Sequence, residues 1–339
     1  MLSRVAGSLY WMSRYLERAE NQARLIDVNL QILLDFGELP DETLNQHWGP
    51  VLSSSGDKDL FFNLYEHSNN ETVTEFLTFR RENPNSLISC ISNARENARQ
   101  VRDQISGEMW EVLNDAYHFV QGANAQKLWH SGDGASAFYD QIKRYSHLFQ
   151  GITHATFFQN EGFEFIEFGK FLERADKTTR LLDIKYHILL PKITDVGGAV
   201  DAAQWHAVLR SASALEAYRR FYVADILVGK VVEFLLFEEG FPRSLLFCLR
   251  RMAAYLQQIS QPGKHYQDDA IDSFQRFLVR LGDMSVDQVF DQGLHEFLRE
   301  AQNVIGAVGG FAYNTFMYHP PVDLAAEIRF QQQEEQQQQ

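Results

Sequence analysis

A Glu-Arg dipeptide occurs twice in this chain, as Glu17-Arg18 and again 156 residues later as Glu173-Arg174. In both places an aromatic residue and a leucine precede the dipeptide, and an alanine follows it. An arginine guanidinium clamps carboxylates and other anions through paired N–H donors. A glutamate next to it either balances that charge or acts as a general base. The repeated pair therefore predicts a charged network that is either structural or in contact with a polar ligand.

The polar face of the first helix continues with Glu20, Asn21 and Arg24, and the second copy has Asp176, Lys177 and Arg180 at matching places. On a solvated face, an i,i+4 acid–base pair would contribute only about 0.2–0.5 kcal/mol. Apolar residues lie beside this face in both copies, which favours helices that are covered on both sides. Buried charges need partners, because an unpaired one costs several kcal/mol. We therefore expect a sheltered Glu–Arg network.

A second charged segment contains Arg95, Glu96, Asn97 and Arg99. Arg95, Arg99 and Arg102 share one helical face, since they are spaced four and three residues apart. In a chain of net charge −14, such a row would create a local positive patch. The second copy keeps basic residues only at the start of the corresponding segment. The row is therefore either a solvated basic face or part of an asymmetric site that is weighted to the first copy.

Matching segments continue beyond the Glu-Arg motifs. Residues Pro84–Cys90 and Pro242–Cys248 share the pattern Pro-x-Ser-Leu-x-x-Cys at an offset of 158 residues. Small loop insertions would explain the drift from 156 to 158. We interpret the chain as two duplicated halves, 1–160 and 161–320, fused in one globular unit with pseudo-twofold symmetry. The segment 330–339 is almost entirely Gln and Glu and is predicted to be a disordered tail.

Helical periodicity dominates the sequence and strand-like alternation is nearly absent, which predicts an all-α helical bundle. Pro84 and Pro242 are expected in the first turn of the helices that they begin, because proline suits that position. The predicted helices span residues 3–36, 43–54, 57–67, 71–80, 84–106, 108–126, 134–157, 161–190, 201–211, 213–238, 242–260, 267–282 and 286–317.

Composition excludes several classes of function. The chain carries 31 basic against 45 acidic side chains, which disfavours binding to nucleic acid or to anionic lipid. Its two cysteines, Cys90 and Cys248, fall inside predicted helices and are expected to be core residues in a reducing cytosol. The N-terminus lacks a signal-peptide pattern, and no segment is long and apolar enough to span a membrane. We therefore expect a soluble, cytoplasmic protein.

Sequence motifs of well-known chemistry are missing. The chain has no E-x-x-H metal motif, no phosphate-binding G-x-x-x-x-G-K-[ST] loop and no G-x-G-x-x-G fingerprint after a strand. It also lacks the G-x-S-x-G elbow of serine hydrolases. We therefore expect neither a metal nor a cofactor.

The segment Arg4–Asp27, which contains Tyr-Leu-Glu-Arg-Ala-Glu-Asn, resembles the opening motif of the bacterial alpha-E family. The second charged segment and the second Glu-Arg copy are also similar to that family, so the resemblance covers the chain except its Gln-rich tail. It implies a helical domain of unknown function, associated with circularly permuted ATP-grasp proteins and transglutaminase-like peptidases in a peptide-ligation or peptide-tagging system. It transfers no catalytic residue, only the motif positions Glu17, Arg18, Glu173 and Arg174.

Three functions are consistent with these features. The leading hypothesis is a helical accessory protein that acts with an ATP-grasp partner and binds a peptide or amino-acid carboxylate in a polar cleft lined by the Glu-Arg helices. The alternative is an enzyme of acyl or amide transfer, with Glu17 or Glu173 as general base and arginines that stabilise an oxyanion. The third is a passive structural scaffold without a ligand.

Overall fold

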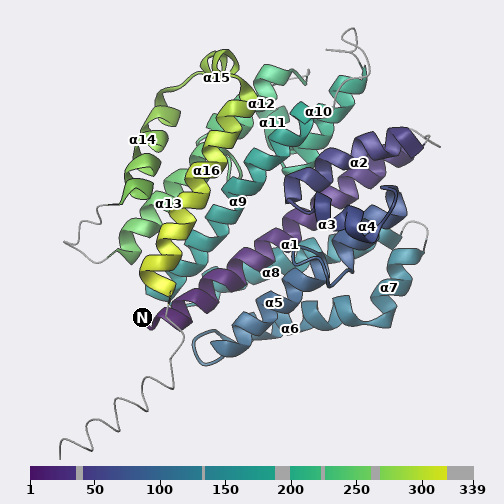
Figure 1. Ribbon diagram of the computed structural model, residues 1–339. Helices are drawn as coiled ribbons and strands as arrows, with labels where there is room; N and C mark the ends of the chain where they lie inside the picture. Colours follow the sequence, from purple (N-terminus) through teal and green to yellow (C-terminus); the bar gives the residue numbers. More distant parts are fainter. Residues whose placement is uncertain (36–40, 132–133, 188–198, 223–225, 261–267, 319–339) are drawn as a thin grey trace, which may run out of the picture.

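The computed structural model describes residues 1–35, 41–131, 134–187, 199–222, 226–260 and 268–318 (Figure 1). Within these ranges the chain forms sixteen α-helices and no strand, so the all-α prediction is confirmed. The first eight helices are α1 (Ser3–Asp35), α2 (Asp41–Ser55), α3 (Lys58–Leu64), α4 (Asn70–Thr78), α5 (Leu87–Gln100), α6 (Gly107–Gln121), α7 (Ala123–His130) and α8 (Gly134–Thr156). The others are α9 (Glu161–His187), α10 (Ala199–Ser211), α11 (Leu215–Phe221), α12 (Val228–Phe237), α13 (Leu245–Ile259), α14 (Asp269–Asp283), α15 (Val286–Gln292) and α16 (Leu294–Ala312), followed by one π-helical turn, Tyr313–Met317.

Three helices predicted as single elements are each divided in two, and these predictions were wrong. Helix α6 ends and α7 begins at Gly122, where the backbone is extended at φ −74° and ψ 139°. Helix α15 ends at Gly293, whose φ of +96° is strained for residues with a side chain. Helices α11 and α12 are also separate, because Tyr222 takes an extended conformation after α11. An isolated glycine inside a helical pattern is not a reliable stop signal, since it costs only about 1 kcal/mol relative to alanine.

Helices α5 and α13 begin three residues later than predicted. Ser86 and Ser244 cap them, each accepting a hydrogen bond from the backbone N–H three residues on, at 3.3 and 3.2 Å. Pro84 and Pro242 therefore lie in the preceding turns and not inside the helices. The carbonyl oxygens of these turns are left outside the helical hydrogen-bond ladder and accept side-chain donors.

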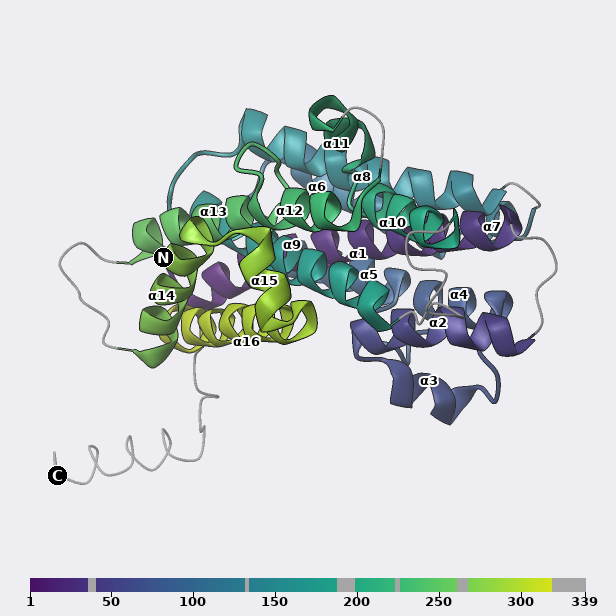
Figure 2. The same ribbon diagram turned by 90° about the horizontal axis from the view of Figure 1, so that it is seen from above.

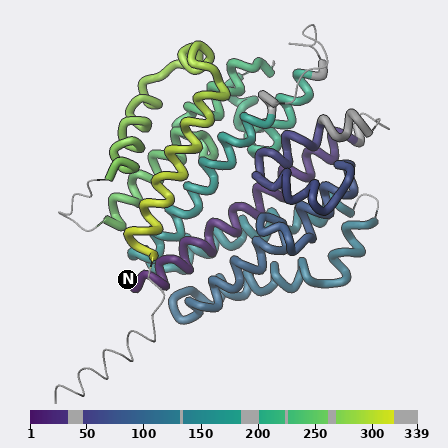
Figure 3. The backbone as a smooth tube through the Cα atoms, in the orientation of Figure 1, coloured from purple at the N-terminus to yellow at the C-terminus, as the bar shows by residue number. Residues whose placement is uncertain are grey.

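The two long helices α1 and α9 run through the middle of the molecule (Figure 3). Helix α1 packs against α5, α8 and α9, and helix α9 packs against α1, α13 and α16. Figure 2 shows α16 running alongside α9, on the side away from α8. Both helices are thus covered on several sides, which explains why Glu17, Glu20 and Glu173 on their polar faces are buried.

Two hydrophobic clusters form the core, and α1 contributes to both. Its residues up to Leu16 belong to a cluster shared with α9, α13 and α16, whereas those from Ala19 onward belong to a cluster with α2 to α8. Glu17 and Arg18 lie where α1 passes from one cluster to the other. The charged layer therefore lies at the junction of two apolar regions.

Part of the sequence prediction lies outside the described residues. This applies to the predicted Gln-rich tail at 330–339 and to the outermost residues of three predicted helices. Among the helices that are described, none has the length and apolar character needed to cross a bilayer.

Candidate functional site

The two Glu-Arg dipeptides pair with each other across the contact between α1 and α9. Arg174 donates from Nε and Nη2 to the two carboxylate oxygens of Glu17, at 2.8 and 2.9 Å. Arg18 donates in the same two-pronged way to Glu173, at 2.7 and 3.0 Å. The glutamates are 1% and 0% exposed, so both carboxylates are shielded from solvent. Neither arginine makes a hydrogen bond to the glutamate next to it in sequence among the bonds of the described residues.

Further donors complete the coordination of each buried glutamate. Glu17 also accepts hydrogen bonds from Arg243 and from Gln150, both at 3.0 Å. Glu173 also accepts one from Arg14, at 2.9 Å. Burial alone would raise the pKa of Glu17 and Glu173, but the neighbouring arginine charges outweigh it and lower both pKa values. Both carboxylates are therefore ionised in the folded protein at neutral pH.

The next acid–base pair along each helix differs between α1 and α9. On α1, Glu20 is fully buried and is held by Arg24 and by Arg243, which donates at 3.0 and 3.1 Å. On α9, Asp176 and Arg180 form a 2.8 Å pair whose side chains are 17% and 34% exposed. The α1 pair is sealed inside the protein, and the α9 pair is accessible to a ligand.

A groove of about 460 Å³ lies above Glu173, between α1, α9 and α16. We call it the basic groove. Its described lining contains four cationic side chains and a single acidic one, Asp176. The lining residues are Tyr10, Trp11, Arg14, Arg18, Ser55, Asn85, Leu172, Asp176, Lys177, Arg180, Gln302, Ile305, Gly306, Gly309, Gly310 and Tyr313.

The cations of the basic groove are not fully neutralised by the carboxylates beneath and beside them. Arg14 and Arg18 share the one carboxylate of Glu173. The Nζ of Lys177 is 3.9 Å from both Glu173 and Asp176, and it makes no hydrogen bond within the described part of the chain. The groove therefore has an excess of positive charge in a chain whose net charge is −14. Such a local field attracts anions.

Helix α16 leaves room along its side of the basic groove. A Cβ atom added at Gly306 or Gly310 would meet no other atom within 4 Å, so both positions face open space. Gly309 differs, because a Cβ there would be 3.0 Å from Leu172 on α9. The glycines thus allow α16 to approach α9 closely and keep the groove wide. Trp11 and Tyr313 contribute aromatic surface to its walls.

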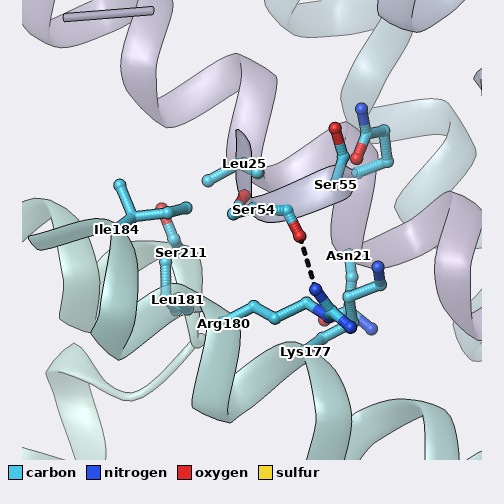
Figure 4. A pocket seen from close by; sticks show the side chains of 10 residues that line it. Asn21, Leu25, Ser54, Ser55, Lys177, Arg180, Leu181, Ile184 and Ser211 are labelled. Atoms are coloured by element: carbon cyan, nitrogen blue, oxygen red, sulfur yellow. Dashed lines mark hydrogen bonds between the residues drawn. The ribbon is translucent and has the colours of Figure 1, made fainter. Parts of the chain in front are cut away.

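A smaller cavity of about 30 Å³ adjoins the basic groove and shares Ser55, Lys177 and Arg180 with it. We call it the end cavity. In Figure 4 Arg180 crosses its floor and donates a 3.1 Å hydrogen bond to the carbonyl oxygen of Ser54. The lining residues are Asn21, Gln22, Leu25, Ser54, Ser55, Lys177, Arg180, Leu181, Ile184 and Ser211.

The second charged segment lies elsewhere. Arg95 donates to Asn114 at 2.8 Å and stacks over the ring of Tyr117, so it joins α5 to α6. Arg99 forms an exposed pair with Glu96. Asn97, the fourth residue of that segment, bonds a backbone carbonyl of its own helix. None of them is among the described residues that line the basic groove, whose cations come from α1 and α9 instead.

Sequence reasoning missed several residues of this region. Arg243 binds both Glu17 and Glu20, and it occupies the variable position of the Pro-x-Ser pattern that α13 shares with α5. The equivalent Asn85 accepts a 2.8 Å hydrogen bond from Arg18. The repeated pattern was thus a usable signal, because in both places its middle residue touches a Glu-Arg pair. Arg14 and Gln22 carried no comparable signal, whereas Lys177 was expected on the charged face of the second copy.

The described residues contain no group of three or more His, Cys, Asp or Glu side chains placed to hold a metal ion. What the region offers is a set of fixed N–H donors and cations, which suits the binding of an anion.

The fold and the crossed ion pairs define an all-helical protein with a buried Glu–Arg layer at its centre. The chain belongs to the Alpha-E family, which is described as a predicted α-helical domain with a conserved ER motif and matches residues 1–317. It is similar to uncharacterized proteins of Mycobacterium bovis and Mycobacterium tuberculosis, with 26% identity over 311 residues. The match covers 88% of this chain but 34% of those proteins, so the chain spans about a third of their length. No solved structure matches the chain significantly.

Proposed function

We propose that this protein is an accessory binding protein of an ATP-grasp-associated peptide-ligation or peptide-tagging system, and that its basic groove holds a peptide or amino acid by a carboxylate. The observation that carries this proposal is the excess of cations along the groove. Lys177 in particular presents an ammonium group that makes no hydrogen bond within the described residues. A ligand carboxylate would supply the missing acceptor and balance the charge.

The dimensions of the basic groove support a small ligand. Its volume of about 460 Å³ falls within the range of small-molecule sites, about 300–1,000 Å³. Aromatic surface from Trp11 and Tyr313, next to the charged side chains, suits a peptide that carries both polar and apolar groups. Long-range attraction of the anion would also raise its association rate.

The structure disfavours the alternative in which Glu17 or Glu173 is a general base. An efficient general base has a pKa near the working pH. Burial opposes ionisation of both glutamates, yet their arginine partners lower both pKa values, and both side chains are shielded from solvent. Their carboxylate oxygens are already occupied by donors from the protein. The buried pairs are better suited to hold α1 and α9 together beneath a binding groove.

The partner in this proposal comes from the family resemblance. An ATP-grasp protein would activate the carboxylate that the groove presents, and a transglutaminase-like peptidase would act in the same system. The longer mycobacterial relatives support a protein that works together with another domain or protein. About two thirds of their length lies outside the segment that matches this chain. Because the ATP-grasp partner needs ATP, we propose that the two proteins act in the cytoplasm.

We also propose that residues 1–160 and 161–320 are two halves of a duplication with pseudo-twofold symmetry. The crossed pairs Glu17–Arg174 and Glu173–Arg18 support this, since each is the counterpart of the other under exchange of the halves. Helix α1 packs on α5 and α8, and α9 packs on α13 and α16 in the same way. This matching arrangement also supports the duplication.

Binding of triglutamate at low ionic strength tests the proposed ligand class. We expect calorimetric binding to the wild type that weakens with added salt. Lys177→Gln should weaken it about tenfold, because a hydrogen bond to a charged group is lost. Lys127→Gln, which removes an exposed lysine of α7, is the matched control and should bind like the wild type. Absence of binding to the wild type, or equal affinity of Lys177→Gln, would refute the groove as a carboxylate site.

Co-purification tests the partner. A tagged ATP-grasp protein from the same genome should retain this chain at micromolar concentration. Clean separation of the two proteins under those conditions would refute the proposed partnership with an ATP-grasp protein. The proposal that the basic groove binds a carboxylate would not be affected.

A further inference from the structure

Few buried polar atoms of the described residues lack a hydrogen-bond partner, and two of these atoms belong to residues of the candidate site. Within the described residues, three buried side-chain atoms have no hydrogen-bond partner, namely Gln22 Nε2, Gln302 Nε2 and Asp57 Oδ2. Gln22 lines the end cavity and Gln302 lines the basic groove. A buried donor without an acceptor costs about 1–3 kcal/mol. Gln22 is only 6% exposed, so water from the surface does not satisfy it freely.

The described lining of the end cavity carries only positive and neutral side chains. Of its ten described lining residues, Lys177 and Arg180 are cationic and none is acidic. Helices α2 and α10 both end here, at Ser55 and Ser211, and helix C-termini repel anions. That repulsion is reduced, because Arg180 covers the carbonyl oxygen of Ser54 and Arg24 covers that of Ser211. The cavity therefore suits a negatively charged group.

The size and shape of the end cavity limit what the group is. A volume of about 30 Å³ compares with at least about 10–15 Å³ for a single water molecule on the same measure. On that measure it has room for about two or three water-sized groups, which is too little for an aromatic ring. Figure 4 shows Leu25, Leu181 and Ile184 gathered on one side, away from Lys177. This apolar side is a surface for a methyl-sized substituent.

We propose that the end cavity binds the C-terminal carboxylate of a peptide whose last residue is glycine or alanine. Lys177 donates to the carboxylate, and the buried Gln22 amide turns towards the cavity to donate as well. The preceding residues of the peptide lie along the basic groove. This inference rests on the proposed function, since it assumes that the groove takes a peptide. It adds the direction in which the peptide binds and the size of its last side chain.

A panel of short peptides tests the inference by calorimetry. Trialanine should bind about tenfold more tightly than its C-terminal amide, because the amide lacks the charge that Lys177 meets. It should also bind more tightly than Ala-Ala-Phe, whose ring does not fit the cavity. Equal affinity for trialanine and its amide would overturn the inference, and so would equal affinity for Ala-Ala-Phe.

Triglutamate distinguishes this failure from failure of the proposed function. If triglutamate binds through Lys177 while trialanine and its amide bind alike, only the end cavity assignment falls. If triglutamate and trialanine both fail to bind the wild type, the proposed function and the inference fall together.

Gln22→Met gives a second, independent readout. It keeps the length of the side chain and removes the unpaired donor, so the melting temperature should stay level or rise. Affinity for trialanine should fall about tenfold, since the donor to the carboxylate is lost. Gln126→Met, at an exposed site on α7, is the control and should leave the affinity unchanged. A Gln22→Met variant that melts at a lower temperature and binds trialanine normally would show a purely structural glutamine.

Discussion

Arg174 on α9 holds both carboxylate oxygens of Glu17 on α1, with donor–acceptor distances of 2.8 and 2.9 Å. Arg18 and Glu173 form the same contact in the opposite direction. The two long helices are therefore joined at one crossing by two ion pairs whose carboxylates are buried. A buried charge that loses its partner cannot recover it from solvent. Removing one residue of either ion pair should therefore lower the free energy of unfolding.

Arg174→Met should lower the free energy of unfolding by about 3 kcal/mol, because Glu17 stays buried and loses one of its arginine partners. Urea unfolding measures the loss. Arg99→Met is the control, since Arg99 forms an exposed pair with Glu96, and it should show no measurable change. Equal stability of Arg174→Met and the wild type would mean that the crossed pairs do not hold the helices.

Stability should fall in acid because of the buried carboxylates. Burial opposes ionisation of Glu173, but Arg18 and Arg14 outweigh it and lower its pKa from 4.5 in the folded state. The unfolded chain then binds more protons, so the unfolding free energy declines as the pH drops below 4.5 and continues to decline towards the folded pKa. Each such carboxylate contributes a slope of up to about 1.4 kcal/mol per pH unit. Urea titrations in this range should give a shallower slope for Glu173→Gln than for the wild type, and identical slopes would contradict the assignment.

Both thiols should be inert in the folded protein. Cys90 and Cys248 are fully buried, and burial raises the pKa of each to about 12. The thiolate is the reactive form, so a chromogenic disulfide reagent at mildly alkaline pH should label neither residue. In denaturant, two thiols per chain should react. Rapid labelling of either cysteine without denaturant would show that its helix opens.

Filling the basic groove should block binding without harming the fold. Gly306→Leu places a side chain where a Cβ meets no neighbour within 4 Å. Gly151→Leu on α8 is the matched control, because that exposed helical glycine also faces open space. Both variants should gain about 1 kcal/mol of stability or less from improved helix propensity. Only Gly306→Leu should lose affinity for triglutamate, and unchanged affinity would place the ligand outside the groove.

The sequence predicted the first helix and its charges well, for local reasons. The 3.6-residue pattern placed α1 at 3–36, and the structure has Ser3–Asp35. Apolar residues beside the polar face indicated that Glu17 and Glu20 would be covered, and both are buried. Burial then required partners, although the pattern could not say which. The pairing of Glu17 with Arg174 joins residues 157 apart and depends on the packing of two helices.

The basic groove could not be predicted, because it is made by packing three helices from distant parts of the chain. The helical pattern places Lys177 on the charged face of α9, but its lack of a hydrogen bond within the described residues emerges only from the geometry around Glu173 and Asp176. The glycines of α16 carry no signal of a groove until α16 lies against α9. Gln22 is one of several polar residues on α1, and only its burial distinguishes it.

A crystal structure with trialanine bound would show directly where the peptide and its carboxylate lie. We expect the peptide in the basic groove, with its terminal carboxylate within hydrogen-bonding distance of Lys177 Nζ and Gln22 Nε2. A peptide bound along the exposed face of Arg99, or with its carboxylate pointing away from α9 into solvent, would contradict this expectation.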